Sequence, residues 1–287
     1  MRIYFETSTY NSLLTKNKYP RAIRDKVIEW AQRTRTDIVF SVMAWEEFAQ
    51  TPDLHRRTNL FRFAGGICDP IMLGMVQELF VGEIATTLGQ HAKTTLFMTR
   101  EWIKRALRDN LQNVPEEKRG EFRPRNKEML NVWRDGIRKA KAHPDIKLME
   151  SMSIEVFRDQ FRNTTFTEWI RFYAGKYITD FSDAATADVA RNTPISLDGF
   201  AEYWTAMAYA NLSSIKKPKL NDNVDLFHAA YMYHVNFFVS ADVDFVDIAR
   251  LSPILKSRVL LLSELIEQYV LPNRSLHTTK PYFRVAL

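Results

Sequence analysis

Two neighbouring stretches near the end of the chain decide the fold: residues 221–230 read NDNVDLFHAA, and residues 237–245 read FFVSADVDF. The first stretch has the pattern of a helix with Asp225 in its first turn. The second stretch begins as a buried strand and ends in an expected turn that carries Asp242 and Asp244. Near the N-terminus, residues 2–8 (RIYFETS) form an expected apolar strand that ends in Glu6. A fold that brings these strand ends together gathers carboxylates at one point, and such clusters commonly hold divalent cations.

Strand and helix patterns alternate in the first part of the chain. An apolar strand is expected over 2–6, a helix after Pro20, a second strand over 37–42 and a helix over 44–50. This alternation predicts an α/β fold with a parallel central sheet that is covered by helices. The same pattern returns late in the chain, with helices expected over 225–233 and 263–269 and strands over 237–240 and 259–262.

The middle of the chain has no convincing strand pattern. A turn or short edge strand is expected over 65–70, and helical spacing follows over 72–88, 94–111, 126–142, 154–160, 166–177 and 197–211. We therefore predict two parts. Residues 1–70 and 216–287 form a discontinuous α/β domain, and residues 71–215 form a large all-helical insertion subdomain.

The composition is that of a folded protein with an excess of positive charge. The chain has 287 residues, of which 46% are hydrophobic and 13% aromatic, and its formal net charge is +6. A basic protein of this kind is compatible with a polyanionic partner. The single cysteine, Cys68, excludes an intramolecular disulfide framework, so we expect a reducing, cytoplasmic environment. We see neither a signal-peptide pattern nor an apolar run of about 18 residues, and expect no membrane span.

Several enzyme classes are not indicated by the sequence. It has no glycine-rich phosphate loop followed by Lys-Ser/Thr and no Gly-x-Ser-x-Gly nucleophile turn. Cysteine and histidine do not recur at the spacing of a structural zinc site. The strand-end acids therefore remain the strongest chemical signal.

The order of these motifs resembles that of the PIN-domain nucleases. The shared elements are a strand followed by acid-Thr-Ser, a helix with Glu before an apolar residue, Asp-x-x-x-Ala-Ala, and Val-Ser-x-Asp-x-Asp-Phe. The resemblance covers both flanks, about half of the chain, and its most specific part is formed by Asp225, Ala229, Ala230, Asp242 and Phe245. It implies a PIN-like fold and a metal-dependent nuclease with acids at the mouth of a parallel sheet.

Carried over by position, the resemblance assigns the metal-binding and catalytic acids to Glu6, Glu47, Asp225 and Asp242. The chain departs from the family in two respects. Glu6 stands where the family usually has Asp, and the long middle insertion is absent from the small toxin members.

The chemistry of phosphodiester cleavage fits these acids. The reaction needs an activated water and neutralisation of charge on the phosphate, and Mg²⁺ or Mn²⁺ supplies both through oxygen ligands. We expect one or two such ions as cofactors. Asp244, Thr7 and Ser240 are expected to support the ligands, the last two by hydrogen bonds.

Each candidate also has a simpler structural interpretation. Asp225 could be only a helix cap, and Glu46 competes with Glu47 for the ligand position. His228 lies one helical turn after Asp225, so it either faces the site or is a hydrogen-bonded core histidine. Asp222 is interpreted as a loop residue.

Basic residues provide candidate contacts to nucleic acid. Lys216, Lys217 and Lys219 directly precede the acidic helix and are expected to contact a phosphate backbone. Further Lys and Arg residues between 104 and 141 form either a solvated helical face or a phosphate-binding surface.

The function that these features favour is a Mg²⁺- or Mn²⁺-dependent endoribonuclease, acting as a toxin or a phage-defence effector. RNA is preferred to single-stranded DNA because the resembled family mostly cuts RNA, and a toxin implies an inhibitory protein partner. A homo-oligomer is also left open. Two alternatives stand: a nucleic-acid-binding or scaffold protein with weakened catalysis, and a structure-specific DNA nuclease.

Overall fold

The computed structural model describes residues 1–15, 18–68, 72–90, 97–98, 122–142, 152–178, 181–192, 194–220 and 222–272. Its strands are β1 (Arg2–Phe5), β2 (Asp37–Ser41), β3 (Met72–Leu73), β4 (Phe97–Met98), β5 (Phe237–Ser240) and β6 (Val259–Leu261). They form one sheet in the order β4-β3-β2-β1-β5-β6. All neighbouring strands are parallel except β4, which runs antiparallel to β3. The prediction of an α/β fold with a parallel central sheet is confirmed.

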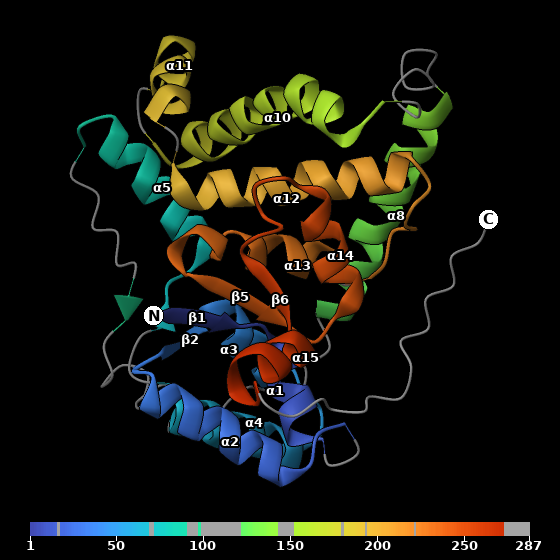
Figure 1. The fold of residues 1–287 in the computed structure, drawn as a ribbon. Coiled ribbons are helices and arrows are strands. Elements are labelled where there is room, and N and C mark those ends of the chain that lie inside the picture. The colour runs from blue at the N-terminus through green and yellow to red at the C-terminus, as the bar shows by residue number, and fades with distance from the viewer. Residues whose placement is uncertain are drawn as a thin grey trace.

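Helices cover both faces of this sheet (Figure 1). The α-helices of the described chain are α1 (Thr7–Leu14), α2 (Arg21–Arg33), α3 (Val42–Ala49), α4 (Leu54–Ile67), α5 (Val76–Thr87), α8 (Phe122–Ala142), α10 (Ile154–Tyr177), α11 (Asp183–Asn192), α12 (Ile195–Leu212), α13 (Asp222–Ala229), α14 (Val243–Leu251) and α15 (Leu262–Leu265). A 3₁₀ turn, η1 (Met232–His234), precedes β5, and a π-helical turn, η2 (Ile266–Val270), follows α15. Within the described ranges, we find no helix with the length and apolar character needed to cross a bilayer.

The alternation of side chains along the strands creates two cores. Ile3 and Phe5 of β1 point to one face and pack with α1, α2 and α4. Tyr4 points to the other face and packs with residues of α5, α10, α12 and α13. Because successive strand residues face opposite sides, strands of this kind are apolar throughout when both faces are covered.

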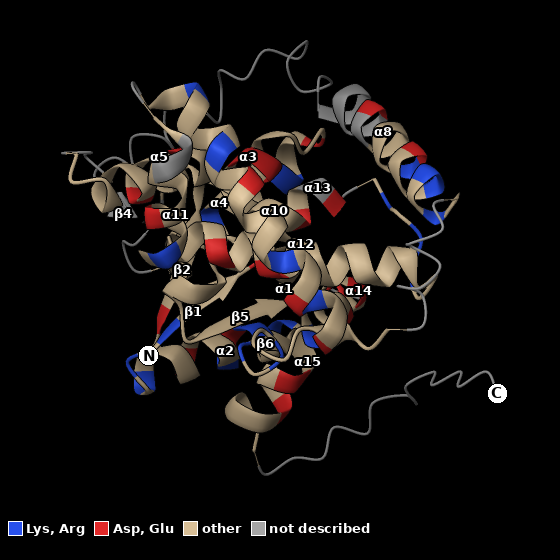
Figure 2. Cartoon of the chain, turned by 90° about the horizontal axis from the view of Figure 1, so that it is seen from above, with Lys and Arg blue, Asp and Glu red and all other residues tan. Residues whose placement is uncertain are grey.

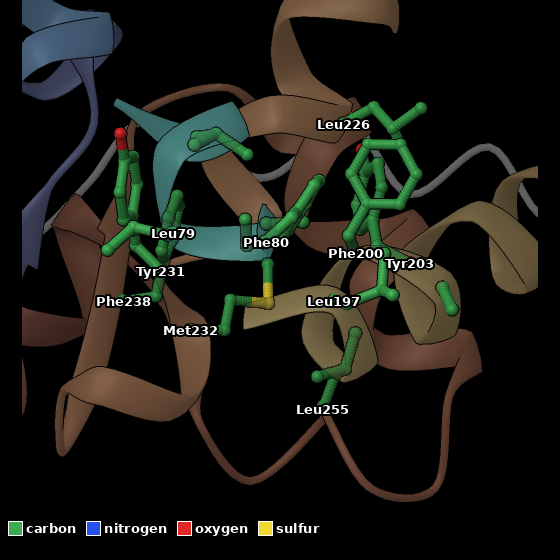
Figure 3. Close-up of a cluster of buried hydrophobic side chains, with 14 of the residues drawn as sticks. Leu79, Phe80, Leu197, Phe200, Tyr203, Leu226, Tyr231, Met232, Phe238 and Leu255 are labelled. Atoms are coloured by element: carbon green, nitrogen blue, oxygen red, sulfur yellow. The ribbon is translucent and has the colours of Figure 1, made fainter. Parts of the chain in front are cut away.

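The second of these cores is rich in aromatic rings. Figure 3 shows Phe80 of α5 beside Phe200 of α12, and Phe238 of β5 beside Tyr231. The ring centroids of Phe80 and Phe200 are 5.3 Å apart in an edge-on arrangement, and Phe238 stacks on Phe245 at 5.0 Å. Such pairs add to the free energy gained by burying the rings. The middle helices are therefore packed directly on the sheet.

The strand order contains a reversal that matters for function. From β1 the sheet grows through β2 to β3 on one side and, after a long connection, through β5 to β6 on the other. β1 and β5 are neighbours, with Tyr4 opposite Phe238 and Phe5 opposite Val239. In open parallel sheets, ligands bind beyond the carboxyl ends of the strands at such a reversal.

Several expected element boundaries were wrong. The turn expected at Gly65 and Gly66 lies inside α4, which begins after the cap residue Asp53. The helices expected over 154–160 and 166–177 form the single helix α10. The turn expected at Asp242 and Asp244 is the start of α14. In these places capping and tertiary packing outweigh the local turn signals.

The stretch 71–215, expected to be all helical, contains the short strands β3 and β4, which lie on either side of α5 in the sequence and extend the sheet. The remaining described residues of this stretch form helices or short connections between them. Since α5, α10 and α12 share one core with β1 and β5, the division into two domains stays a prediction.

A buried histidine in this core predicts a pH-dependent stability. His234 is 8% exposed in its side chain, and its Nε2 lies 2.6 Å from Ser196 Oγ. Burial, helped by the charge of Arg2, lowers the pKa of His234 to about 4. The carboxylate of Glu83 is 3.6 Å from Nε2, too far for a hydrogen bond, and Ser196 Oγ contacts both groups. The imidazole therefore stays neutral in the folded protein.

We expect this histidine to destabilise the fold as the pH falls. Below pH 6.5 the unfolded chain binds a proton that the native state does not bind until about pH 4. Stability is therefore lost as the pH falls through that window. Between pH 7.5 and 4.5 the wild type should lose about 2 to 3 kcal/mol more than His234→Gln. Urea unfolding at both pH values measures this difference, with the exposed His55→Gln as control. Parallel losses in wild type and His234→Gln would contradict it.

Candidate metal centre

Glu6 lies where β1 ends, beside the end of β5. It is the N-cap of α1, and its Oε2 accepts a hydrogen bond from Ser8 N at 2.9 Å. The hydroxyl of Ser240, the last residue of β5, donates to the same oxygen at 3.0 Å. The Glu6 backbone N–H donates to Val239 O at 3.0 Å. The carboxylate is thus fixed at the reversal point of the sheet.

Glu47 and His228 approach Glu6 from two further elements. Glu47 belongs to α3 and His228 to α13, and His228 Nε2 lies 2.8 Å from Glu47 Oε2. Thr7 Oγ1 also donates to Glu47 Oε2. One ligand atom from each of Glu6, Glu47 and His228 lies within 4.8 Å of the other two. These three residues form what we call the Glu6–Glu47–His228 cluster, which is compact enough to hold one metal ion.

The imidazole of His228 is held from its other side as well. Its Nδ1 is 2.5 Å from Tyr4 OH, which in turn is 2.7 Å from Ser41 Oγ. His228 and Tyr4 are fully buried. Burial lowers the pKa of His228, but the hydrogen bond and charge of Glu47 and the charge of Glu6 carry the pKa above its usual value.

Asp225 and Asp242 lie in a cavity of about 270 Å³ next to this cluster. The cavity is lined by Lys216, Lys219, Leu220, Asp222, Asp225, Asp242 and Asp244. Burial raises the pKa of Asp225 well above its usual value, and the charges of Glu6 and Asp242 raise it further. The charge of Asp225 therefore interacts with a residue of the cluster, Glu6, and with a residue of the cavity, Asp242. In the described chain, neither Asp225 nor Asp242 has a ligand atom in a group within 4.8 Å.

Asp242 has a structural role in addition to its place in the cavity. It is the N-cap of α14, and its Oδ1 accepts hydrogen bonds from Asp244 N at 2.9 Å and Phe245 N at 3.3 Å. Its own backbone N–H donates to Ser240 Oγ at 3.0 Å. Ser240 therefore connects Asp242 to Glu6, since the same hydroxyl contacts both residues.

Two of the three lysines that were expected to contact phosphate, Lys216 and Lys219, line the cavity. Lys216 Nζ is 3.2 Å from Asp222 Oδ1, and Lys219 pairs with Asp244. The Lys219 backbone N–H donates to Asp222 Oδ2 at 2.8 Å, so Asp222 is a buried anchor at the start of α13 and not a loop residue. Lys217 is exposed and does not line the cavity.

The segment that carries these lysines also contacts α8. Arg134 Nη2 donates to Pro218 O at 3.3 Å, and Lys141 Nζ donates to Ser214 Oγ at 2.6 Å. Figure 2 shows Lys and Arg positions on α8 and on the neighbouring segment that leads to α13. Basic residues thus lie both at the cavity and on α8, where acids such as Asp135 are interspersed with them. The other basic residues expected between 104 and 121 lie outside the described residues.

The arrangement divides the predicted site into two adjacent parts. Glu6 and Glu47 lie in the cluster, while Asp225 and Asp242 lie in the cavity beside it. Thr7 donates a hydrogen bond to Glu47, and Ser240 donates one to Glu6, so both contact a predicted ligand. Asp244 faces Lys219.

Sequence reasoning did not select His228 for the cluster. The signal that was available is its spacing from Asp225, since residues three apart in a helix lie on the same face. The alternative of a buried, hydrogen-bonded histidine is also met, since both ring nitrogens have partners. Glu46, the competitor of Glu47, lies outside the cluster, and burial followed by the charge of Glu47 raises its pKa.

The electrostatics of the site favour a bound cation. Burial raises the pKa of Glu6; the charge of His228 opposes this rise, and that of Glu47 adds to it. Carboxylates that are buried beside one another carry a free-energy cost when ionised, and a cation removes that cost. The donor set of carboxylate oxygens and one imidazole nitrogen fits a divalent metal ion.

No protein-family model, curated protein or solved structure matches this chain.

Proposed function

We propose that this protein is a Mg²⁺- or Mn²⁺-dependent nuclease of PIN-like fold that cleaves the phosphodiester bonds of RNA. The observation that carries the proposal is the convergence of acids from distant parts of the chain. Glu6 and Glu47 lie together beside the reversal point between β1 and β5, and Asp225 and Asp242 line the adjacent cavity, within a protein of net charge +6.

The residues of the site divide the work of such a reaction. Glu6 and Glu47 would hold the metal, with Thr7 and Ser240 orienting their carboxylates through hydrogen bonds, and Asp225 and Asp242 would add negative charge from the adjacent cavity. When bound, the metal lowers the pKa of a water ligand and neutralises charge on the scissile phosphate. Lys216 and Lys219 stand at the cavity, where they can contact neighbouring phosphates of the strand.

Removal of the metal should abolish cleavage. A fluorescently labelled RNA and a single-stranded DNA of the same sequence are incubated with the full chain in Mn²⁺, in Mg²⁺ and in EDTA. We expect cleavage of RNA with either ion, loss of cleavage in EDTA and recovery when Mn²⁺ is added in excess. Cleavage that persists in EDTA would contradict the proposal. Cutting of DNA alone would favour a structure-specific DNA nuclease.

A second function is favoured by the state of the Glu6 carboxylate. Its Oε2 already accepts hydrogen bonds from Ser8 N, Ser8 Oγ and Ser240 Oγ, and His228 can supply positive charge nearby. A site satisfied in this way suits a nucleic-acid-binding or scaffold protein with weakened catalysis. Binding of RNA that depends steeply on salt but produces no cleavage in Mn²⁺ would support this second function.

The cellular role that we propose rests on the resemblance of the motifs to the PIN-domain nucleases. An endoribonuclease acting in the cytoplasm would serve as a toxin or a phage-defence effector, and a toxin requires an inhibitory protein partner. Co-purification of a tightly bound inhibitor, or self-association into a homo-oligomer, is measured by size-exclusion chromatography with light scattering.

A further inference from the structure

The Glu6–Glu47–His228 cluster contains a nitrogen donor, and this has consequences for the metal that it selects. Mg²⁺ takes oxygen ligands almost exclusively and retains several waters. First-row transition ions accept imidazole nitrogen together with carboxylate oxygen. In this cluster, His228 Nε2 lies 2.8 Å from the nearer Glu47 oxygen, so the nitrogen belongs to the same small volume as the carboxylates.

The orientation of the His228 ring is set by Tyr4 and Ser41 as well as by the acidic residues of the cluster. Tyr4 OH lies 2.5 Å from His228 Nδ1, and Ser41 Oγ lies 2.7 Å from Tyr4 OH. All three side chains are buried. Metal-binding histidines almost always make a hydrogen bond through their other ring nitrogen, which fixes both the tautomer and the direction of the ligand atom.

Asp225 provides an independent sign that negative charge is in excess at this place, since the charge of Lys216 only partly offsets the effect of Glu6 and Asp242 on its pKa. Among the described residues, its carboxylate has no hydrogen-bond or salt-bridge partner, although it lies close to Glu6 and Asp242. A buried or partly buried carboxylate is normally paired or bound to a metal. A cation between the cluster and Asp225 would satisfy this group.

We propose that His228 Nε2 is a direct metal ligand alongside Glu6 and Glu47, and that the site therefore prefers a first-row transition ion such as Mn²⁺ to Mg²⁺. The inference deepens the proposed nuclease function by naming the ion and the additional ligand. When the ion binds, the contact between Nε2 and Glu47 Oε2 is replaced by two metal–ligand bonds. Any proton on Nε2 would leave to solvent, and the metal-binding tautomer would carry its proton on Nδ1, which would donate a hydrogen bond to Tyr4 OH. The Tyr4 hydroxyl then donates to Ser41 Oγ.

Isothermal titration of the full chain with Mn²⁺ and with Mg²⁺ tests this preference. We expect His228→Gln to weaken Mn²⁺ binding by at least about 10-fold, since even outer-sphere partners contribute about 10- to 100-fold. Mg²⁺ binding should change much less, because Mg²⁺ does not depend on nitrogen. Tyr4→Phe, which leaves the ligands intact, should weaken Mn²⁺ by about 10-fold. The exposed His55→Gln is the control and should match wild type.

A second measurement does not depend on a variant. In the wild type, pulsed electron paramagnetic resonance of bound Mn²⁺ should show coupling to an imidazole ¹⁴N nucleus. Absence of that coupling, absence of Mn²⁺ binding, or tighter Mn²⁺ binding by His228→Gln would each overturn the inference. Tighter binding would mean that the imidazole serves as a fixed positive charge in place of a metal.

The two proposals can fail separately. Nitrogen-ligated Mn²⁺ without any cleavage of RNA would leave the metal site standing and remove the nuclease function. Metal-dependent cleavage with no nitrogen coupling would support the nuclease function and overturn the assignment of His228 as a metal ligand.

Discussion

Asp225→Asn is expected to abolish metal-dependent RNA cleavage and to raise the thermal stability of the metal-free protein. Asn keeps the size of the side chain but removes the charge that a cation needs. Loss of one preorganised charge-stabilising group costs about 100- to 1,000-fold in rate, so single-turnover cleavage should fall by at least that factor. Gel-based cleavage assays under excess enzyme measure it.

The stability effect has the opposite sign for a clear reason. Burial and the charges of Glu6 and Asp242 raise the pKa of Asp225 in the folded state. An acid whose pKa is higher when folded contributes unfavourably to stability at any pH above its unfolded pKa, because the ionised form is then the one that must be buried. In EDTA at neutral pH, the melting temperature of Asp225→Asn should therefore exceed that of wild type.

The matched control for this variant is Asp247→Asn. Asp247 lies exposed on α14, close in sequence to Asp242 but outside the cavity. It should leave both cleavage and melting temperature unchanged. If Asp225→Asn cleaved RNA at the wild-type rate, Asp225 would have no role in catalysis. If the melting temperature of the variant fell, the carboxylate would have a structural role.

Glu202→Ala is expected to produce a large loss of stability. Glu202 on α12 is only 1% exposed, and its Oε1 lies 2.6 Å from Arg158 Nε on α10 and 2.7 Å from Ser252 Oγ after α14. Its Oε2 lies 3.2 Å from Arg162 Nε. Removal of one partner from a buried ionic network leaves the others uncompensated, and we expect a loss of about 3 kcal/mol in the free energy of unfolding.

Urea unfolding with an unchanged dependence on denaturant measures this loss. The control is Asp188→Ala, which breaks the exposed pair of Asp188 with Arg191 on α11. Exposed pairs contribute about 0 to 1 kcal/mol, so this variant should remain close to wild type. Equal effects in the two variants would mean that the Glu202 network contributes no more than a surface pair.

The parts of the fold that could be predicted from sequence are those with local signals. β1, β2, β5 and β6 are short apolar runs, the first three with an acid or a hydroxyl at or just after the end, and their alternation with helices predicted the parallel sheet. By contrast, β3 has only two residues, and its strand character comes from pairing with β2. α4 was missed because Gly65 and Gly66 are turn formers that are tolerated on the exposed side of this helix.

The sequence indicated most of the residues of the candidate site, but not which of them lie together in the structure. Glu46 and Glu47 are adjacent in sequence, and only the direction in which α3 faces α13 decides which of them reaches His228. The contact between Glu47 and His228 spans 181 positions, and no local pattern reports on it. The role of Asp242 as a cap of α14 was hidden because a cap and a ligand use the same residue types.

The pairing of β1 with β5 also bears on how the protein is made. These strands are separated by more than 200 residues, yet β5 supplies the hydrogen-bonding partner on one side of β1. During synthesis on the ribosome, a nascent chain that has emerged only as far as α12 contains Glu6 and Glu47 but lacks His228, Asp225 and Asp242. Contacts between such distant segments form late, because a long loop must close first. A nuclease built in this way would remain inactive near the translating ribosome until the residues through Asp242 have emerged.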